Sequence, residues 1–361
     1  MLTGAVVVFF LIPATLAGLY YTAGCILGRF RRRLPARTPS LRIAILIPAH
    51  NEESTLPQAL ASIAAADYPR ELIGVRVVVD HCTDGTEGLA RQFGADCTVR
   101  RDSSERSKGY ALAAGLAELL PSRPDGILIL DADCRISPGL LKRLDRERAA
   151  GASVVQAAVV STVDPQNPVS MVAAMGAALD NRMASAADWL GLYVPLRGTG
   201  MFFAREILER HPWTKYGLAE DAEYGAELRR SAVRIRFVAD ESVSCEAPPQ
   251  RQAFLVQRRR WRASLRVPQA PWPTRWLASK PLILVHLLLT DFAVLLFAPG
   301  DWLAIWLLIL MGLTAAIYAD AMLMVGVRWP GFRSFWLVGR LAVLSLGSLW
   351  AREARWQRTA R

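Results

Sequence analysis

Two aspartates, Asp131 and Asp133, directly follow the apolar run 127–130 and carry the strongest chemical signal in the sequence. Side chains at positions i and i+2 of an extended chain fall on the same side, so the two carboxylates can converge on one hard cation. A divalent ion held in this way can bridge phosphate oxygens and neutralise the charge that develops on a leaving diphosphate. A solvated turn after a strand is the competing interpretation of the same residues.

Acidic residues also end two other apolar runs. Glu52 follows the run 43–49, and Asp80 closes the run 75–79, so that either carboxylate could hydrogen-bond a nucleotide. Asp84 lies in the next turn, where it fits a turn or capping residue as well as it fits a ligand contact. Glu52 and Asp80 are therefore the candidates for nucleotide contact.

A lysine and two glycines could contribute to a phosphate-binding site, the lysine by its positive charge and the glycines by letting the backbone approach the ligand. Lys108 and Gly109 precede the helical pattern 110–120, and a helix N-terminus with a lysine suits an anionic phosphate. Gly198 and Gly200 lie in the sequence RGTGMFF, where the missing side chains let the backbone approach a ligand closely. A solvated lysine and a structural turn are the alternative interpretations.

Two acids, Glu220 and Asp221, begin the helical pattern 220–228. A carboxylate at this point could accept a proton from an attacking hydroxyl group. Favourable placement of acids near the positive end of the helix dipole explains the same residues without catalysis. The sequence order does not show which of the two acids points inward.

The basic run QRRRW, residues 257–261, combines two features. Gln257, Arg260 and Trp261 are spaced i, i+3 and i+4, so they can share one helical face that looks into an active site. The other arginines of this region are expected to contact lipid headgroups or solvent: Arg258, Arg259 and Arg262.

Short apolar runs rich in β-branched residues alternate with helical patterns between residues 41 and 250. This alternation predicts an α/β domain with a mostly parallel sheet, whose ligand site lies at the carboxyl ends of the strands. The expected strands are 42–49, 74–80, 126–133 and 152–160, and the expected helices include 54–66 and 108–120.

The chain of 361 residues has a formal net charge of +11, is 52% hydrophobic and has a mean hydropathy of +0.22. A composition that is both basic and apolar is typical of a membrane protein and argues against a nucleic-acid partner. The five cysteines are dispersed without metal-binding spacing, which argues against a disulfide framework and favours a reducing compartment.

Apolar segments lie on both sides of the α/β region, and the two after it, 281–300 and 301–327, are interrupted by Asp291 and Asp320. Residues 1–28 carry no charged side chain and are followed by arginines, which predicts a transmembrane helix with its N-terminus outside. Arg333 and Arg340 favour an amphipathic helix over a fourth span at 332–350. The expected organisation is an N-terminal transmembrane helix (1–28), a basic cytoplasmic linker (29–40), a cytoplasmic α/β domain (41–250), an amphipathic interface region (251–280), a transmembrane hairpin (281–327) and an amphipathic basic C-terminal segment (328–361).

Taken together, seven stretches in this order resemble the family 2 glycosyltransferases, inverting enzymes with the nucleotide-binding GT-A fold. The resemblance is to the membrane-embedded branch that includes cellulose, hyaluronan and chitin synthases. The matching stretches are PAHNE (48–52), VVVDHCTDGT (77–86), KGYAL (108–112), DADC (131–134), GTGMFFAR (198–205), AED (219–221) and QRRRW (257–261). Each stretch alone is weak, whereas the ordered set is highly specific.

The resemblance implies a role for each matching residue. Asp133, together with Asp131, would bind Mg²⁺ or Mn²⁺, and Asp221, beside Glu220, would be the general base that deprotonates the acceptor hydroxyl. The residues implied in donor binding are Glu52, Asp80, Lys108, Asp131, Gln257 and Arg260. The residues implied in acceptor binding are Gly198, Thr199, Gly200 and Trp261.

Two positions depart from the family pattern. His50 stands where a tyrosine is common, and Ala219 replaces the threonine of the usual TED sequence, which leaves acceptor specificity open. The predicted membrane region is also smaller than in large polymer synthases. A wide polysaccharide channel would therefore require that chains associate into a homo-oligomer.

The implied activity is inverting, metal-dependent transfer of a hexosyl or N-acetylhexosaminyl group from a nucleotide sugar, with a UDP-sugar favoured. The expected acceptor is a hydroxyl of a growing oligosaccharide or polysaccharide at the cytoplasmic face of the inner membrane, among membrane lipids. A single transfer to a membrane lipid is the alternative reaction. A non-catalytic membrane scaffold with a degenerate transferase fold is the alternative that is not an enzyme.

Overall fold

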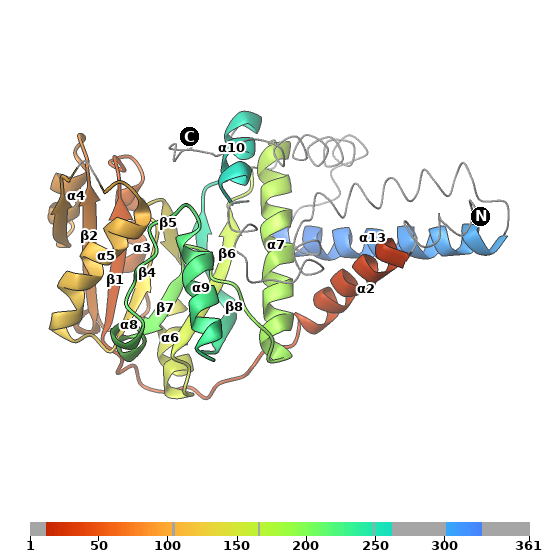
Figure 1. The fold of residues 1–361 in the computed structure, drawn as a ribbon, viewed down its shortest axis with the longest axis horizontal. Coiled ribbons are helices and arrows are strands. Elements are labelled where there is room, and N and C mark those ends of the chain that lie inside the picture. The colour runs from red at the N-terminus through yellow and green to blue at the C-terminus, as the bar shows by residue number, and fades with distance from the viewer. Residues whose placement is uncertain (1–11, 103–104, 165–166, 248–249, 262–300, 327–361) are drawn as a thin grey trace. The chain divides into compact units, whose positions relative to one another are not determined.

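The computed structural model describes residues 12–102, 105–164, 167–247, 250–261 and 301–326 (Figure 1). Its contacts divide the chain into two compact units. The first, called the sheet unit, comprises Arg31–Thr162 and Ala187–Glu246. The second, called the helical unit, comprises Met1–Phe30, Val163–Ala186 and Ala247–Arg361.

Among the described residues, one sheet of eight strands forms the centre of the sheet unit, in the order β3-β2-β1-β4-β7-β6-β8-β5 (Figure 1). Strands β3, β2, β1 and β4 are parallel, and β7 is antiparallel to both β4 and β6. Strand β8 is parallel to β6 and antiparallel to β5. The bounds are β1 Ile43–Ala49, β2 Ile73–Asp80, β3 Asp96–Arg100, β4 Gly126–Ile129, β5 Cys134–Ile136, β6 Val154–Ser161, β7 Met201–Ala204 and β8 Ile235–Cys245.

Strand β1 shows why these apolar runs form strands. Its residues Ile43–Ile47 are buried without interruption, as expected for a parallel strand that is covered on both faces. The parallel register brings the carboxyl ends of β2, β1 and β4 to one edge of the sheet. That edge therefore collects the residues that follow each strand, including Glu52, Asp80 and Asp131.

Helices flank the sheet (Figure 1). Helix α5 packs against β1 and β2, where Gly115 is required, because a Cβ at this position would lie 2.5 Å from Leu46 Cδ1 and 2.6 Å from Val78 Cγ2. The helices of this region are α3 Leu56–Ala64, α4 Thr86–Gln92, α5 Lys108–Leu119, α6 Leu140–Ala149, α8 Arg205–Arg210 and α9 Glu220–Arg230, with short 3-10 helices at Arg70–Leu72 and Leu120–Ser122.

The predicted fold class, an α/β domain with a mostly parallel sheet, is confirmed. Each expected strand and helix is present, with bounds that differ by a few residues from the apolar runs. The patterns did not predict that β7 would insert in antiparallel orientation between β4 and β6. They also did not predict the long helix α7, Pro168–Trp189.

Cys134 and Cys245 form a disulfide, which corrects the expectation drawn from the dispersed cysteines. The two residues are paired directly in the antiparallel β5–β8 ladder, with their Cα atoms 4.4 Å apart. They are 111 residues apart in the sequence, so their pairing follows from the strand order and not from a local spacing. The remaining cysteines are free: Cys25, Cys82 and Cys97.

The described helices of the helical unit are α2 Ile12–Leu27, the part of α7 up to Ala186, α10 Arg251–Trp261 and α13 Asp301–Val325. Asp320 of α13 was expected to interrupt a membrane span. In the structure it is buried and accepts hydrogen bonds from Arg29 Nη2 at 2.7 Å and from Arg182 Nε at 3.0 Å. The two guanidinium groups compensate the buried charge.

By length and apolar composition, one helix among the described residues could cross a bilayer, namely α13 through its segment Leu308–Val325. Helix α2 is apolar but shorter, at 16 residues. The expected span at 281–300 lies outside the described residues, as do residues 1–11. The organisation with three spans and its orientation therefore stay predictions.

Candidate active site

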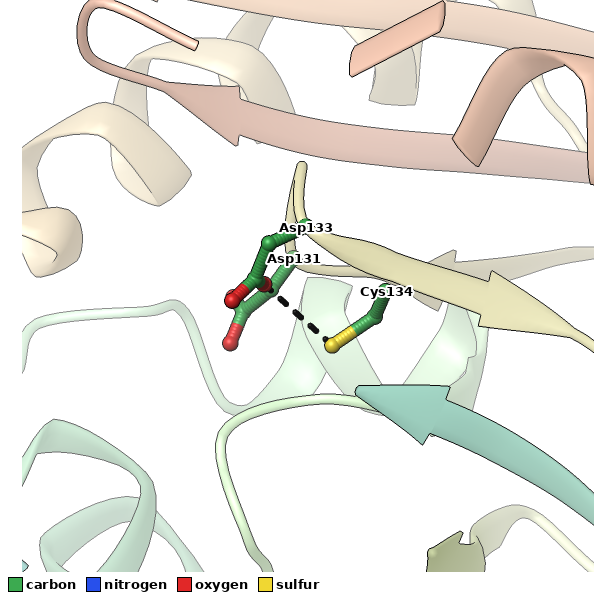
Figure 2. A group of neighbouring side chains, drawn as sticks. All are labelled: Asp131, Asp133 and Cys134. Carbon is green, nitrogen blue, oxygen red and sulfur yellow. Dashed lines mark hydrogen bonds between the residues drawn. The ribbon is translucent and has the colours of Figure 1, made fainter. Parts of the chain in front are cut away.

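Asp131 and Asp133 lie in the short connection between β4 and β5. Figure 2 shows both carboxylates and the Cys134 sulfur on one side of this connection, and one ligand atom of each residue lies within 4.8 Å of the others. Cys134 Sγ is 3.3 Å from Asp133 Oδ1 but is bonded to Cys245, so the aspartate oxygens are the groups suited to a metal. The carboxylates converge as their spacing predicts, and their role as metal ligands stays a prediction.

Lys108 begins α5 and connects several parts of the site. Its ammonium nitrogen lies 2.5 Å from Asp131 Oδ1 and donates a hydrogen bond to Gly198 O at 2.7 Å. Burial acts to lower the pKa of Lys108, but the carboxylates of Asp131, Glu220 and Asp221 outweigh burial, so its pKa is raised overall. Lys108 is therefore a fixed cation at the edge of the sheet.

A short loop before β7 lies between Lys108 and Asp221. Gly198 in this loop has a φ of 78°, in the left-handed region that favours glycine. A Cβ at Gly198 would lie 3.3 Å from Lys108 Nζ and 3.4 Å from Asp221 Oδ2. Thr199 Oγ1 accepts a hydrogen bond from the backbone N–H of Asp131 at 3.1 Å. The loop thus contacts Lys108 and Asp131, and the space beside its Gly198 is bordered by Asp221.

Asp221, in the first turn of α9, has a raised pKa. Burial and the neighbouring Glu220 carboxylate raise the pKa of Asp221 to about 7, against the lowering effect of Lys108. Its Oδ1 accepts a hydrogen bond from the backbone N–H of Ala222 at 2.8 Å. Of the two acids that begin α9, Asp221 is therefore the one that faces Gly198, a choice that the sequence order did not make.

The two expected nucleoside contacts have partners within the protein. Asp80 is buried at the end of β2, where its Oδ1 accepts a hydrogen bond from Arg100 Nη1 at 2.5 Å and lies 3.0 Å from His81 Nδ1. Glu52 Oε2 accepts a hydrogen bond from Thr55 Oγ1 at 2.6 Å. The sequence patterns did not single out Arg100 as a site residue. It could have been found from its position at the end of β3, which lies next to β2 in the sheet.

A stacked aromatic pair borders the start of α5 and was also missed. The rings of Tyr110 and Tyr216 are 4.2 Å apart between centroids and 8° from parallel. Beside them, Gly109 allows close contact between the two segments, since any Cβ at this position would collide with Lys215 O. The start of α5 is therefore joined to the segment that precedes α9.

The residues of the QxxRW motif lie on one helix, α10, as their spacing predicts. Gln257, Arg260 and Trp261 share one face of that helix by its periodicity. The side chains of Arg260 and Trp261 lie outside the described residues, and α10 belongs to the helical unit. Their contacts with donor and acceptor therefore stay predictions.

The sheet unit thus brings together a compact set of groups able to do chemistry. Two carboxylates offer hard oxygen ligands, one half-buried ammonium offers a fixed positive charge, and one carboxyl group has a pKa raised to about 7. Such a set suits the transfer of a group from a phosphate-bearing donor to a hydroxyl. The residues concerned are Lys108, Asp131, Asp133, Gly198, Thr199 and Asp221.

Two curated proteins are similar to this chain in sequence. The "Probable glycosyltransferase YdaM" of Bacillus subtilis (strain 168) is 25% identical over 248 residues, which cover 64% of this chain and 58% of that protein. The "Beta-monoglucosyldiacylglycerol synthase" of Synechocystis sp. is 25% identical over 232 residues, which cover 62% of this chain and 47% of that protein. The chain thus spans about half the length of the curated relatives it matches.

A solved structure and a family pattern complete the comparison. The mannosyltransferase PcManGT from Pyrobaculum calidifontis, in complex with GDP-Man and Mn²⁺, has a TM-score of 0.62 and 19% identity and covers 98% of this chain and 100% of that chain. At this identity the likeness concerns the fold, which is α/β and GT-A-like. The pattern of the family described as "Glycosyltransferase like family 2" matches residues 39–264. Because this match covers more than half of the chain, the protein belongs to glycosyltransferase family 2.

Proposed function

We propose that the protein is an inverting, metal-dependent glycosyltransferase that moves a sugar from a nucleotide sugar to a hydroxyl group of a membrane lipid. Its family supports the transferase activity, and the proposal adds the stereochemistry, the metal and the acceptor. The observation that carries the proposal is the position of Gly198 between Lys108 and Asp221. A cation suited to phosphate and a proton acceptor thereby both lie beside the space that Gly198 leaves open.

The proposed donor is a nucleoside diphosphate sugar, with UDP as the expected nucleotide. Lys108 supplies a positive charge for the diphosphate beside Asp131. At the ends of β2 and β3, the carboxylate of Asp80 can accept hydrogen bonds, and the guanidinium group of Arg100 beside it can donate them. That pair complements a base edge on which an N–H group lies beside a carbonyl, as in uracil. Guanine has the same arrangement, so GDP-sugars belong in the test.

Asp131 and Asp133 fit a hard divalent cation, because both offer carboxylate oxygens, the ligands that Mn²⁺ and Mg²⁺ prefer. Asp131 is paired with Lys108, which makes Asp133 the proposed principal ligand. When bound, the cation would supply positive charge to the diphosphate that leaves the sugar.

Asp221 is the proposed general base. It accepts the proton of the acceptor hydroxyl while the hydroxyl oxygen forms a bond to the anomeric carbon of the sugar. The bond between that carbon and the phosphate oxygen breaks on the opposite face, so the configuration inverts, and Lys108 offsets part of the charge on the departing diphosphate. A carboxyl with a pKa of about 7 is a stronger base than an ordinary aspartate and is still partly ionised at neutral pH.

A lipid acceptor is proposed because two observations favour a membrane surface. One curated relative is a beta-monoglucosyldiacylglycerol synthase, and α13 has the length and composition of a membrane helix. The arginines that follow α2 support the further proposal that the sheet unit lies at the cytoplasmic face of the inner membrane, with the N-terminus outside. The second candidate is extension of an oligosaccharide or polysaccharide, which the QxxRW residues on α10 favour.

The test is a donor screen with the purified full-length protein in lipid nanodiscs that contain diacylglycerol. Labelled UDP-sugars and GDP-sugars are added with Mn²⁺ or Mg²⁺, and products are sized and extracted. The expected product is one lipid-extractable species, with an anomeric configuration opposite to that of the donor, and its formation stops on addition of EDTA. A ladder of polymers would reject the lipid acceptor in favour of the second candidate, and a retained configuration would reject the mechanism.

A further inference from the structure

Gln156 is a fully buried amide in strand β6, with 0% exposure, next to the loop that carries Gly198. Its Oε1 accepts a hydrogen bond from the backbone N–H of Arg197 at 2.9 Å. Its Nε2 donates to Thr199 O at 2.9 Å and to Ala157 O at 2.8 Å. One side chain on the neighbouring strand thus binds the loop on both sides of its glycine.

The contacts of this amide fit one orientation. If the amide were reversed, its NH₂ group would face the N–H of Arg197 and its oxygen would face carbonyl oxygens. An amide buried without partners costs about 1–3 kcal/mol in protein mutational data, so an apolar residue would suit this part of a strand better unless the loop needed the amide. The loop supplies the partners that make glutamine favourable here.

Among the described residues, backbone hydrogen bonds of the sheet hold Gly200 at the end of the loop, whereas side chains bind the residues before it. Gly200 donates its N–H to Ile129 O at 2.9 Å, and β7 begins at the next residue. The N–H of Arg197 and the carbonyl of Thr199 are bound instead by the Gln156 side chain. The conformation of the loop therefore depends on that side chain.

Other atoms of the same loop make the contacts that organise the site. Gly198 O accepts the hydrogen bond from Lys108 Nζ at 2.7 Å, and Thr199 Oγ1 accepts one from the N–H of Asp131 at 3.1 Å. Asp221 Oδ2 limits the space at Gly198. A displacement of the loop would move the partners of the cation and of the aspartate pair, and would change the surroundings of the base.

We propose that Gln156 is a positioning residue of the transferase reaction, which fixes the loop so that Lys108 and Asp131 meet the donor while Asp221 meets the acceptor hydroxyl. This role rests on the proposed function and deepens it. Gln156 acts through the loop and not by contact with the reacting atoms. It lies outside the seven stretches that resemble the glycosyltransferase family.

Two substitutions separate the contacts of Gln156. Gln156→Met removes all of its hydrogen bonds at nearly constant length, whereas Gln156→Glu keeps an acceptor for Arg197 but loses both N–H donors when it is ionised. The matched control is Thr98→Val. Thr98 is also buried in a strand, on β3, and donates to Glu118 Oε2 at 2.7 Å away from the loop.

Hydrogen–deuterium exchange on the ligand-free full-length protein reads the loop without reference to the reaction. The amides of residues 197–200 should exchange faster in both Gln156 variants, while β1 and β2 exchange as in the wild type. Binding of Mn²⁺, alone and with UDP, should weaken by about 10–100-fold, as is usual when a group that orients metal ligands is lost. The turnover number should fall in parallel, and Thr98→Val should leave binding and turnover unchanged.

Three outcomes would overturn the proposal. In the first, residues 197–200 of Gln156→Met are as protected from exchange as in the wild type. In the second, Thr98→Val weakens Mn²⁺ binding as much as the Gln156 variants do. In the third, the loop of the Gln156 variants exchanges faster but Mn²⁺ binding and turnover stay at the wild-type level. A wild-type protein that uses no nucleotide sugar would instead reject the proposed function. In that case loop exchange and Mn²⁺ binding still decide whether Gln156 holds the site.

Discussion

Asp221 and Asp133 are chemically identical side chains whose surroundings give them different uses. Burial and the adjacent Glu220 raise the pKa of Asp221 to about 7, so that it can accept a proton at neutral pH. Asp133 lies instead beside a second aspartate, Asp131, and their oxygens converge in the way that the proposed cation site requires. At the scale of the residue, function is therefore decided by the burial and the neighbouring charges of each side chain.

The pH dependence of the reaction follows from the pKa of Asp221. The base must be ionised to accept a proton, and below pH 7 most of it is protonated because its pKa is raised to about 7. We expect kcat/KM to rise about tenfold per pH unit below pH 7 and to level off above it. Initial rates measured between about pH 5 and 9 would show this limb, and a flat profile would contradict the assignment of the base.

Removal of the base should separate catalysis from binding. Asp221→Asn should lower kcat by about 10²–10⁴-fold, because the amide cannot take the proton. Mn²⁺ and nucleotide binding, measured by calorimetry, should stay close to the wild type. Glu223→Gln is the control, since Glu223 lies in the same first turn of α9. If kcat fell by the same factor in both variants, a general disturbance of α9 would explain the loss better than removal of a base.

Removal of a carboxylate from the aspartate pair should act on the metal. Asp133→Asn should weaken Mn²⁺ binding by roughly 100-fold, because affinity for hard cations depends strongly on the number of charged ligands. Asp96→Asn provides the control, since Asp96 is 76% exposed on β3 and pairs with Arg76. Electron paramagnetic resonance of free Mn²⁺ would measure the Mn²⁺ affinity of both variants. Equal affinities in the two variants would refute the metal site.

At the scale of elements, the sequence is most informative where a local pattern determines the structure. The runs at 43–49 and 126–129 are strands because a parallel strand buried on both faces needs continuous apolar residues. Their carboxyl ends then meet at one edge, which is why Asp131 could be assigned to the site before its neighbours were known. Helix α9 likewise begins at the predicted acids, Glu220 and Asp221.

What could not be predicted depends on contacts between distant segments. Gln156 reads as an ordinary polar residue in an apolar run, and its function appears when β7 and its loop insert beside β6. Cys134 meets Cys245 because β5 pairs with β8 at the far end of the sheet. Lys108 is fixed by Gly198, 90 residues away in the chain. No local spacing encodes these partners.

The loop before β7 offers a test at this scale with a closely matched control. Gly198→Ala and Gly191→Ala both place a Cβ at a φ above 70°, which costs each variant about 1–2 kcal/mol of folding free energy. The new Cβ of Gly198→Ala meets Lys108 and Asp221, whereas that of Gly191→Ala meets open space. We expect similar melting temperatures for the two variants but loss of activity in Gly198→Ala alone, measured under identical assay conditions. Equal activities would show that the space at Gly198 is not needed.

At the scale of the whole molecule, the chain enters the helical unit three times, and one carboxylate connects the three segments. Asp320 of α13 is 6% exposed and is bound by Arg182 of α7 and by Arg29, which follows α2. Its closer partner in sequence, Arg182, is 138 residues away, so the hydropathy pattern could show the charge but not its compensation. The apolar helices of the unit are thereby joined in a specific arrangement.

The last prediction concerns this buried charge. Asp320→Leu leaves Arg182, which is 14% exposed, without its carboxylate, and should lower the free energy of unfolding by about 3–5 kcal/mol. The double variant Asp320→Leu, Arg182→Met should recover much of that loss, because well-packed apolar residues can replace a buried ion pair at little cost. Thermal unfolding of the wild type, both single variants and the double variant in detergent micelles measures the coupling between the two residues. Losses that simply add in the double variant would show that Asp320 and Arg182 do not depend on each other, and that the helical unit is held by apolar packing instead.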